Sequence, residues 1–135
     1  MRIMADFKPL MKLEIDKIID NGKESERVLI KVLDDCNLNN YILYDETFDE
    51  EGNSSNKVPH MYRFEKRSVK KGEFVSLYTK GEKGYALGTM KTPKGAPLHR
   101  IKRGLDINIF NRKGDIAHLV QINGEDSEIV LPDDK

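Results

Sequence analysis

Residues 11–48, MKLEIDKIIDNGKESERVLIKVLDDCNLNNYILYDETF, decide the fold class, because apolar runs alternate in them with turn-forming residues. In the first run, Leu13 and Ile15 alternate with charged residues. A period of two is typical of a strand with one wet face. Residues 20–25 predict a turn, since Asn-Gly at 21–22 is the strongest hairpin dipeptide.

The second half of this stretch repeats the arrangement. Residues 27–33 are β-branched and apolar on both faces, which predicts a central strand. Residues 34–40 contain Asp and Asn, whose side chains bond their own backbone and break the strand. Residues 41–48 resume a strand. The stretch therefore predicts three strands joined by short turns.

The same pattern continues to the end of the chain. Further strands are predicted at residues 61–66, 69–80, 107–110, 115–122 and 127–132, and the third and fourth of these form a hairpin across residues 111–114. Residues 49–60 are polar and predict a mobile loop. Residues 81–100 contain four glycines and two prolines, and predict a long loop that is either functional or disordered.

No window has a sustained period of 3.6 residues, so the prediction is an all-β fold. About eight or nine short strands, with turns every eight to twelve residues, indicate a sandwich or a barrel. The 135 residues suffice for one domain. We predict a leader over residues 1–10 and a single domain over residues 11–132.

Composition narrows the class of protein. The single cysteine, Cys36, forms no internal disulfide, and the N-terminus has no signal-peptide core. No apolar run approaches the roughly 18 residues of a membrane span. We therefore expect a soluble cytoplasmic protein that has no cofactor and does not bind membranes.

Charge is balanced overall but unevenly distributed. Residues 1–60 contain 8 basic and 13 acidic residues, residues 61–113 contain 14 and 4, and residues 114–135 contain 1 and 6. The basic middle indicates an anionic partner, or strands whose charges neutralise those of the acidic ends.

Four stretches give the chain a resemblance to a known family. They are ERVLIKVLDDCNLNNYILYDE (26–46), YRFEKRSVKKGEFVSLYT (62–79), IFNRKGDIAHL (109–119) and QINGEDSEIV (121–130). Their order and spacing resemble the lamin-tail domain, with Tyr41 and Phe110 standing where that family usually has Trp. The most specific piece is N-x-x-G-D-x-A-x-L, from Asn111 to Leu119.

The resemblance implies an immunoglobulin-like β-sandwich and a binding or architectural module rather than an enzyme. Fold alone does not define activity. Within its most specific piece, Asn111, Gly114 and Asp115 predict a structural turn. The alternative is an anion-binding nest assisted by Arg112 and Lys113.

A candidate basic patch comes from the middle segment. It comprises Arg63, Lys66, Arg67, Lys70, Lys71, Arg100, Lys102, Arg103, Arg112 and Lys113. Tyr62, Phe64, Tyr78 and Tyr85 lie among these charges, as stacking platforms for nucleic acid do. The alternative is cross-strand pairing with the acidic residues of 11–20 and 45–51.

The leading functional hypothesis is a non-enzymatic module that binds a protein or another macromolecule through loops or a sheet face. The alternatives are a nucleic-acid-binding accessory protein that uses residues 61–113, and a metal-dependent hydrolase with Asp45, Asp49, Glu51 and His60. Self-association through edge strands is a further alternative. The carboxylates before Cys36 disfavour a nucleophilic thiolate.

Overall fold

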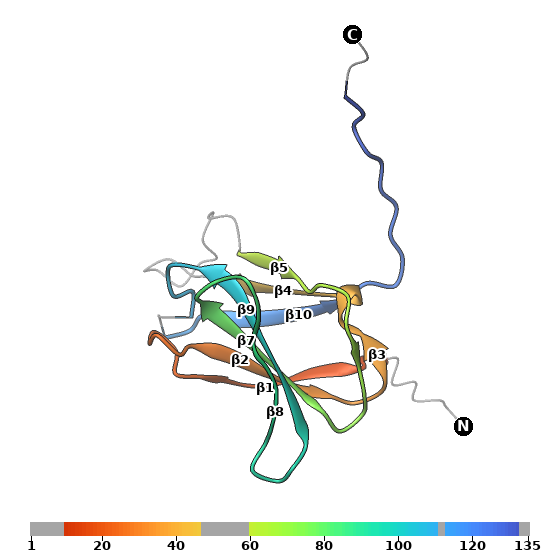
Figure 1. Cartoon of the computed structure of the whole chain (residues 1–135). Coiled ribbons are helices and arrows are strands. Elements are labelled where there is room, and N and C mark those ends of the chain that lie inside the picture. The colour runs from red at the N-terminus through yellow and green to blue at the C-terminus, as the bar shows by residue number, and fades with distance from the viewer. Residues whose placement is uncertain (1–9, 47–59, 111–112, 133–135) are drawn as a thin grey trace, which may run out of the picture.

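Two β-sheets enclose one core in the computed structural model, which describes residues 10–46, 60–110 and 113–132 (Figure 1). The larger sheet has the order β1-β2-β7-β9-β8, and the smaller has the order β10-β4-β5. The larger sheet comprises β1 (Leu13–Ile19), β2 (Arg27–Val32), β7 (Phe74–Lys80), β9 (Pro97–Leu105) and β8 (Gly84–Lys91). The smaller comprises β10 (Ile116–Gln121), β4 (Tyr41–Glu46) and β5 (Met61–Arg63).

Short elements connect the two sheets. β3 (Cys36–Asn37) pairs with β6 (Ser68–Val69), and the 3-10 turn η1 (Leu38–Asn40) leads into β4. All pairings are antiparallel except that of β7 with β9, which is parallel. The all-β prediction is confirmed. Among the described residues, no helix is long and apolar enough to cross a membrane.

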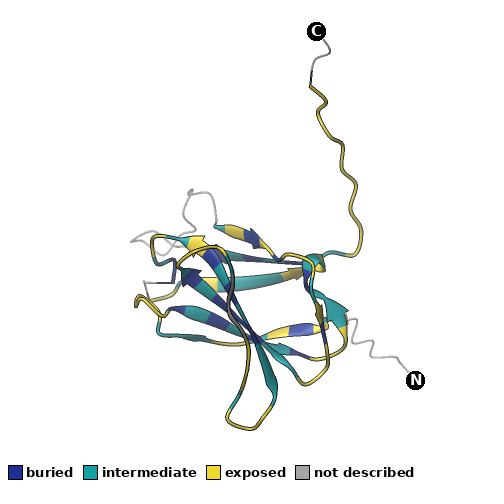
Figure 2. Cartoon of the chain, in the orientation of Figure 1, coloured by how far each residue is buried: buried dark blue, intermediate teal, exposed yellow. Residues whose placement is uncertain are grey.

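The core lies between the inner faces of the two sheets. Buried and half-buried residues alternate along β2 and β4 (Figure 2), as the period of two predicts. Val28 and Ile30 of β2 and Leu43 of β4 are at most 1% exposed. Tyr41 and Phe110 belong to the same buried cluster.

The strand prediction for residues 11–19 is confirmed by β1, although its alternation is interrupted. A register shift between Ile15 and Lys17 inserts one residue, so that Ile15 pairs with Ile30 and Ile18 pairs with Val28. Without this bulge, Ile18 would face the opposite side. The bulge therefore places Ile18 on the core side with Leu13 and Ile15, and Ile19 on the opposite side beside Arg27.

The long loop predicted over residues 81–100 is wrong, because these residues form the hairpin of β8 and β9. Gly81 and Gly84 have φ of +102° and +122° and lie at the bend that enters β8, and Gly95, at +89°, lies in the hairpin turn. Pro97 is the first residue of β9, where a strand tolerates a missing N–H. Gly81, Gly84, Gly95 and Pro97 thus mark the ends of strands, whereas Gly88 lies within β8.

The predicted hairpin of residues 107–110 with 115–122 is also wrong. Residues 115–122 do contain β10, but β10 pairs with β4, and residues 107–110 form no strand. The backbone amides of Ile109 and Phe110 instead donate to the buried carboxylate of Glu26. Gly114 has φ of +97°, as its predicted turn role requires.

The predicted final strand, residues 127–132, is wrong as well. This segment is extended, exposed and without a strand partner among the described residues, and it leads away from the two sheets (Figure 1). Predictions that concern residues 1–9, 47–59, 111–112 and 133–135 lie outside the described residues. They include most of the leader, the loop at 49–60, Asn111 and Arg112.

Candidate functional site: the outer face of the five-stranded sheet

The outer face of the larger sheet combines basic and apolar side chains. Strand register aligns these side chains in three cross-strand rows. We define the outer basic face by the members of these rows: Ile19, Arg27, Tyr78 and Lys102; Lys17, Leu29, Ser76 and Arg100; and Glu14, Lys31, Phe74, Leu98 and Met90. Five members are basic and one is acidic.

Apolar side chains fill the spaces between these charges. Leu29, Phe74 and Leu98 are each half-buried. Ser76, in the middle row, is only 1% exposed, so neighbouring side chains close the centre of the face. The guanidinium of Arg27 lies 5.4 Å from the centre of the Tyr78 ring, a geometry in which the ring attracts the cation. The face is thus a closed surface of mixed character.

Arg27 and Lys31 have acidic partners at the β1 edge. Arg27 Nη1 is 3.2 Å from Asp20 Oδ2, and Lys31 Nζ is 3.6 Å from Asp16 Oδ1. Such partly exposed ion pairs contribute about 0–1 kcal/mol, so a carboxylate of a partner could replace either one at little cost.

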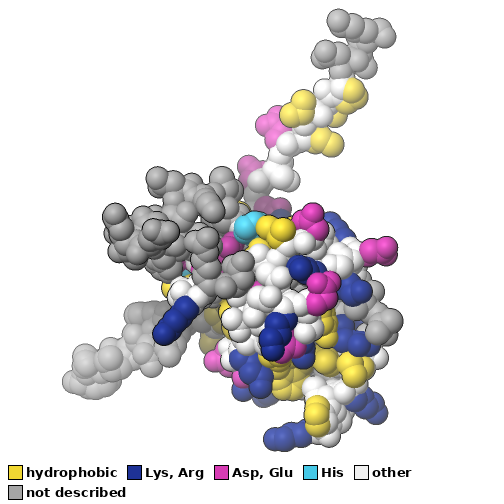
Figure 3. Space-filling view, turned by 90° about the vertical axis from the view of Figure 1, so that its left-hand side faces the viewer, with side chains coloured by type: hydrophobic (Ala, Val, Ile, Leu, Met, Phe, Trp, Pro, Cys, Tyr) yellow, Lys and Arg dark blue, Asp and Glu magenta, His cyan; other side chains and the backbone are white. Residues whose placement is uncertain are grey.

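Figure 3 shows one side of the molecule, on which Lys, Arg and hydrophobic side chains gather over the lower part, where the β8–β9 hairpin lies. A surface that combines Lys and Arg with hydrophobic side chains can hold an anionic chain that also has apolar groups.

The structure distributes the predicted basic patch over several surfaces. Arg100 and Lys102 lie on the outer basic face, and Arg63, Lys66, Arg67, Lys70 and Lys71 belong to the segment from β5 to β7. Lys113 is exposed before β10, and Arg112 lies outside the described residues. The described members therefore do not form one contiguous face.

Arg103 faces the core rather than solvent. It is 8% exposed, and its guanidinium lies 5.6 Å from the centre of the Tyr62 ring. Burial lowers the pKa of Arg103, while the nearby negative charges of Asp45 and Glu26 act in the opposite direction. This buried position makes Arg103 a structural cation.

Arg67 has structural partners. Its Nε donates to His99 Nδ1 over 3.0 Å, and its Nη2 donates to Thr89 Oγ1 over 3.2 Å. Because His99 Nδ1 accepts this hydrogen bond, Nε2 carries the hydrogen in this arrangement, and it lies 2.8 Å from Glu73 Oε1. These contacts attach the β5–β6 loop to β9.

Cross-segment ion pairs neutralise part of the basic segment, although their acidic partners lie outside the predicted ranges 11–20 and 45–51. Arg63 contacts Glu125 over 2.6 Å, Lys80 contacts Glu24 over 3.3 Å, and Lys70 lies 3.9 Å from Asp35. These cations each face an acidic residue from the first or the last segment. Arg100 and Lys102, from the same basic segment, lie on the outer basic face. Charge neutralisation and an anionic partner therefore apply to different residues of the basic segment.

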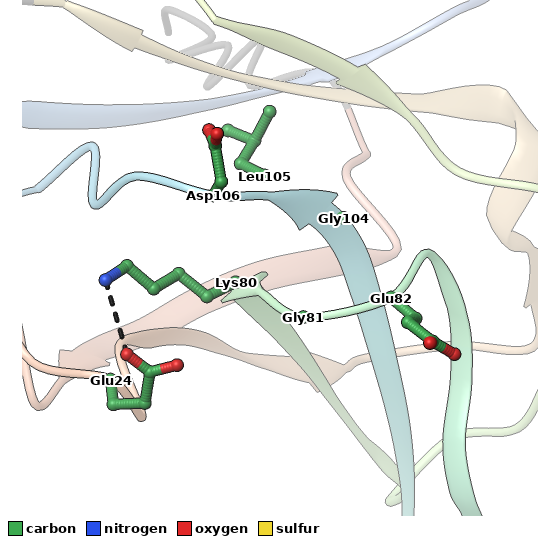
Figure 4. Close-up of a pocket in the computed structure, with 7 residues that line it drawn as sticks. All are labelled: Glu24, Lys80, Gly81, Glu82, Gly104, Leu105 and Asp106. Carbon is green, nitrogen blue, oxygen red and sulfur yellow. Dashed lines mark hydrogen bonds and ion pairs between the residues drawn. The ribbon is translucent and has the colours of Figure 1, made fainter.

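A groove of about 590 Å³ opens beside the ends of β7 and β9. Its lining residues are Glu24, Lys80, Gly81, Glu82, Gly104, Leu105 and Asp106. In Figure 4 the carboxylate of Glu24 points at Lys80, whereas those of Glu82 and Asp106 point elsewhere. Since these carboxylates do not converge, the groove offers no arrangement for acid–base catalysis.

Of the predicted hydrolase residues, the structure brings two together. The amide and ring of His60 contact the 1% exposed carboxylate of Asp45, with Nδ1 3.3 Å from an oxygen. Asp49 and Glu51 lie outside the described residues. Within residues 10–46, 60–110 and 113–132, no three His, Cys, Asp or Glu side chains are grouped closely enough to hold a metal ion.

A polar pocket of about 310 Å³ lies beside Cys36, Tyr41 and Gln121. Burial is the main cause that raises the pKa of the Cys36 thiol, and Asp34 and Asp35 add to it. Burial likewise raises the pKa of Tyr41 to about 12, and its hydroxyl is 2.5 Å from Gln121 Oε1. Neither group is activated as a nucleophile.

Sequence reasoning missed three cations of the outer basic face: Lys17, Arg27 and Lys31. They lie in the first segment, whose acidic excess concealed them. Their alternation could have revealed two of them, because Arg27 and Lys31 flank Leu29 at positions that alternate with the buried residues of β2. The local sequence does not show which strands lie beside β2.

A scan against protein-family models finds none that matches the chain, and a search of curated proteins finds no similar one.

Proposed function

We propose that this chain is a non-catalytic binding module that holds an acidic protein segment on its outer basic face. The observation that supports the proposal most is the set of three cross-strand rows, in which five cations and one acid surround half-buried apolar side chains. We further propose that the sandwich is of the immunoglobulin-like, lamin-tail kind. That proposal is supported by the four resembling stretches and by the burial of Tyr41 and Phe110.

The partner we propose is a protein because of how the aromatic residues of the face are engaged. Bases that stack on a platform need an open ring. The Tyr78 ring already lies beside the guanidinium of Arg27, and Phe74 is half-buried beside Lys31 and Leu98. An extended segment with alternating acidic and apolar residues fits both the cations and the apolar surface between them.

Single-stranded nucleic acid is the second candidate. It is favoured by Lys17, Arg100 and Lys102, which lie in rows that adjoin Phe74 and Tyr78. Displacement of Arg27 from the Tyr78 ring would open a stacking surface. Phosphate binding by such cations depends steeply on salt concentration.

Fluorescence anisotropy with two labelled probes separates the candidates. One probe is a short peptide that alternates Glu with Leu or Tyr, and the other is oligo-dT. The proposal predicts that the peptide binds and keeps part of its affinity as NaCl increases, because apolar contacts are not screened. A control peptide with Lys in place of Glu should not bind.

Tighter and strongly salt-dependent binding of oligo-dT would favour the second candidate instead. Absence of binding to both probes at low salt would contradict both proposals.

A further inference from the structure

The last described residues of the chain form an apolar segment that is exposed to solvent. Ile129, Val130 and Leu131 are 79%, 92% and 73% exposed. Three consecutive apolar residues in an extended, solvated backbone are unfavourable, since both the side chains and the strand-forming backbone lack partners. This segment, residues 127–132, is called the C-terminal segment below.

A strand edge of matching character exists on the smaller sheet. In the sheet order β10-β4-β5, β10 pairs with β4 alone among the described strands. Ala117 and Leu119 face the core but are only half-buried, whereas their partners on β4, Asp45 and Leu43, are 1% exposed. The core is therefore incompletely covered along β10.

The outer side of the same edge presents two apolar side chains, Ile116 and Val120, on either side of His118, which stacks on Tyr44 and contacts Glu46 over 2.7 Å. Ile116 and Val120 are both 40% exposed. A strand added beside β10 would cover apolar side chains on both sides of the sheet. The C-terminal segment can do so, since Ile129 and Leu131 of a strand face one side and Val130 the other.

The course of the chain after β10 leads away from its own β10 edge. The amide of Ile122 donates to Asn40 O over 2.7 Å, and Arg63 holds Glu125 through contacts of 2.8 Å and 2.6 Å. Arg63 lies on β5, at the opposite edge of the same sheet. From there the C-terminal segment extends away from the sheets (Figure 1).

We propose that the C-terminal segment of one copy adds as a strand to the β10 edge of a second copy, and that the two copies exchange these segments reciprocally. Reciprocal exchange gives a closed dimer in which each copy supplies the same two surfaces. Main-chain hydrogen bonds then pair the β10 edge, and the apolar residues of both partners become buried. The dimer uses the smaller sheet and leaves the outer basic face open.

Light scattering of the full chain over a range of concentrations tests the proposal. The wild-type chain should form dimers, and a variant with Ile129→Asp and Leu131→Asp should be monomeric at the same concentrations. The matched control is Leu10→Asp, because Leu10 is also an exposed apolar residue, at 88%. This control should remain dimeric. A wild-type chain that stays monomeric, or a tail variant that still dimerises, would overturn the proposal.

A second variant tests the acceptor edge. Val120→Asp should also prevent dimers of its own, because it places a charge beside the added strand. A mixture of the Val120→Asp chain with the tail variant should restore a heterodimer, since the tail variant retains an intact β10 edge and the other chain retains an intact C-terminal segment. A mixture that stays monomeric would contradict the exchange.

Amide hydrogen exchange distinguishes the exchanged strand from a segment that folds back on its own copy. The proposal predicts protection of residues 127–131 that increases with dimer concentration. Protection in a monomer would show that the segment returns to its own β10, and dimers with an unprotected segment would show another interface. Either result would overturn the proposal.

Discussion

At the scale of single residues, the most constrained side chain is the fully buried carboxylate of Glu26. Its two oxygens accept from the amides of Gly22, Ile109 and Phe110 and from the hydroxyl of Thr79, at 2.6–3.2 Å. Burial pushes the pKa of Glu26 upward, but these hydrogen bonds outweigh burial, and the pKa lies below its usual 4.5. Glu26 thus connects the β1–β2 turn, β7 and the loop before β10.

Replacement of this carboxylate should destabilise the fold. In Glu26→Gln, the new amide group cannot accept, so up to two buried donors lose their partner at a cost of about 1–3 kcal/mol each. We expect a free energy of unfolding about 3 kcal/mol lower, measured by urea denaturation at neutral pH. Glu24→Gln is the control, since Glu24 lies on the same turn with its side chain 87% exposed. A free energy of unfolding that is the same in Glu26→Gln as in the wild-type chain would contradict the role assigned to the carboxylate.

The lowered pKa of Glu26 predicts part of the loss of folding stability at acidic pH. Because the pKa of Glu26 is lower in the folded state, its ionisation stabilises the fold above pH 4.5, and this contribution is lost as the pH falls through the folded-state pKa. The wild-type chain should therefore lose more stability between neutral pH and pH 3 than Glu26→Gln does. Equal losses in the two chains would contradict the depressed pKa.

The sequence does not distinguish Glu26 from its exposed neighbour Glu24, because the features that matter lie far along the chain. The amides of Ile109 and Phe110 are 83 and 84 residues away. Arg103 shows the same limit: alternation along β9 places it on the core side, but only knowledge that residues 97–105 form a strand reveals this. The local sequence therefore shows that Glu26 and Arg103 are charged, but not that they are buried.

At the scale of elements, the strand predictions succeeded where alternation was clear and missed the β8–β9 hairpin, where glycines conceal it. They were also wrong for the short apolar runs at residues 107–110 and 127–132, which pair with no other strand among the described residues. β1, β2, β4 and β7 follow apolar runs and were predicted. The β8–β9 hairpin contains a register shift between Tyr85 and Thr89, and bends at glycines with positive φ. Bulges and such glycines remove the period of two, although the backbone still pairs. The sequence alone therefore predicted a loop there.

Gly104 on β9 provides a prediction for this hairpin. Its φ is +85°, and an added Cβ would lie 2.9 Å from Lys83 Cβ and 3.1 Å from Lys83 Cα. Gly104→Ala should lower the free energy of unfolding by about 2–4 kcal/mol, because positive φ and close backbone packing both oppose a side chain.

Gly95→Ala is the matched control, since Gly95 has φ of +89° with nothing within 4 Å of an added Cβ. It should cost only about 1 kcal/mol. Equal destabilisation of the two variants in thermal denaturation would show that close packing at Lys83 is unimportant.

At the scale of the whole molecule, the sheet topology determines which charged residues share a face. The charge totals of the three sequence segments do not show this. β2 and β1 come from an acidic segment, and β7 and β9 come from a basic one, yet register places cations from both segments on one face. Arg63 and Lys70, from the segment between β5 and β7, instead pair with acidic residues of other segments. The local sequence pattern does not predict a sheet order in which β7 and β9 pair in parallel. Because the outer basic face depends on that order, the face could not be predicted either.

The most direct test of the proposed function is charge reversal on this face, measured as the affinity for the labelled peptide of alternating Glu and apolar residues. Lys17→Glu with Lys102→Glu should weaken binding by about tenfold or more, because both changes oppose an acidic partner. Lys66→Glu with Lys113→Glu alters net charge equally at exposed positions outside the face, and should leave affinity within about threefold. Equal losses in the two double variants would contradict a binding site on the outer basic face.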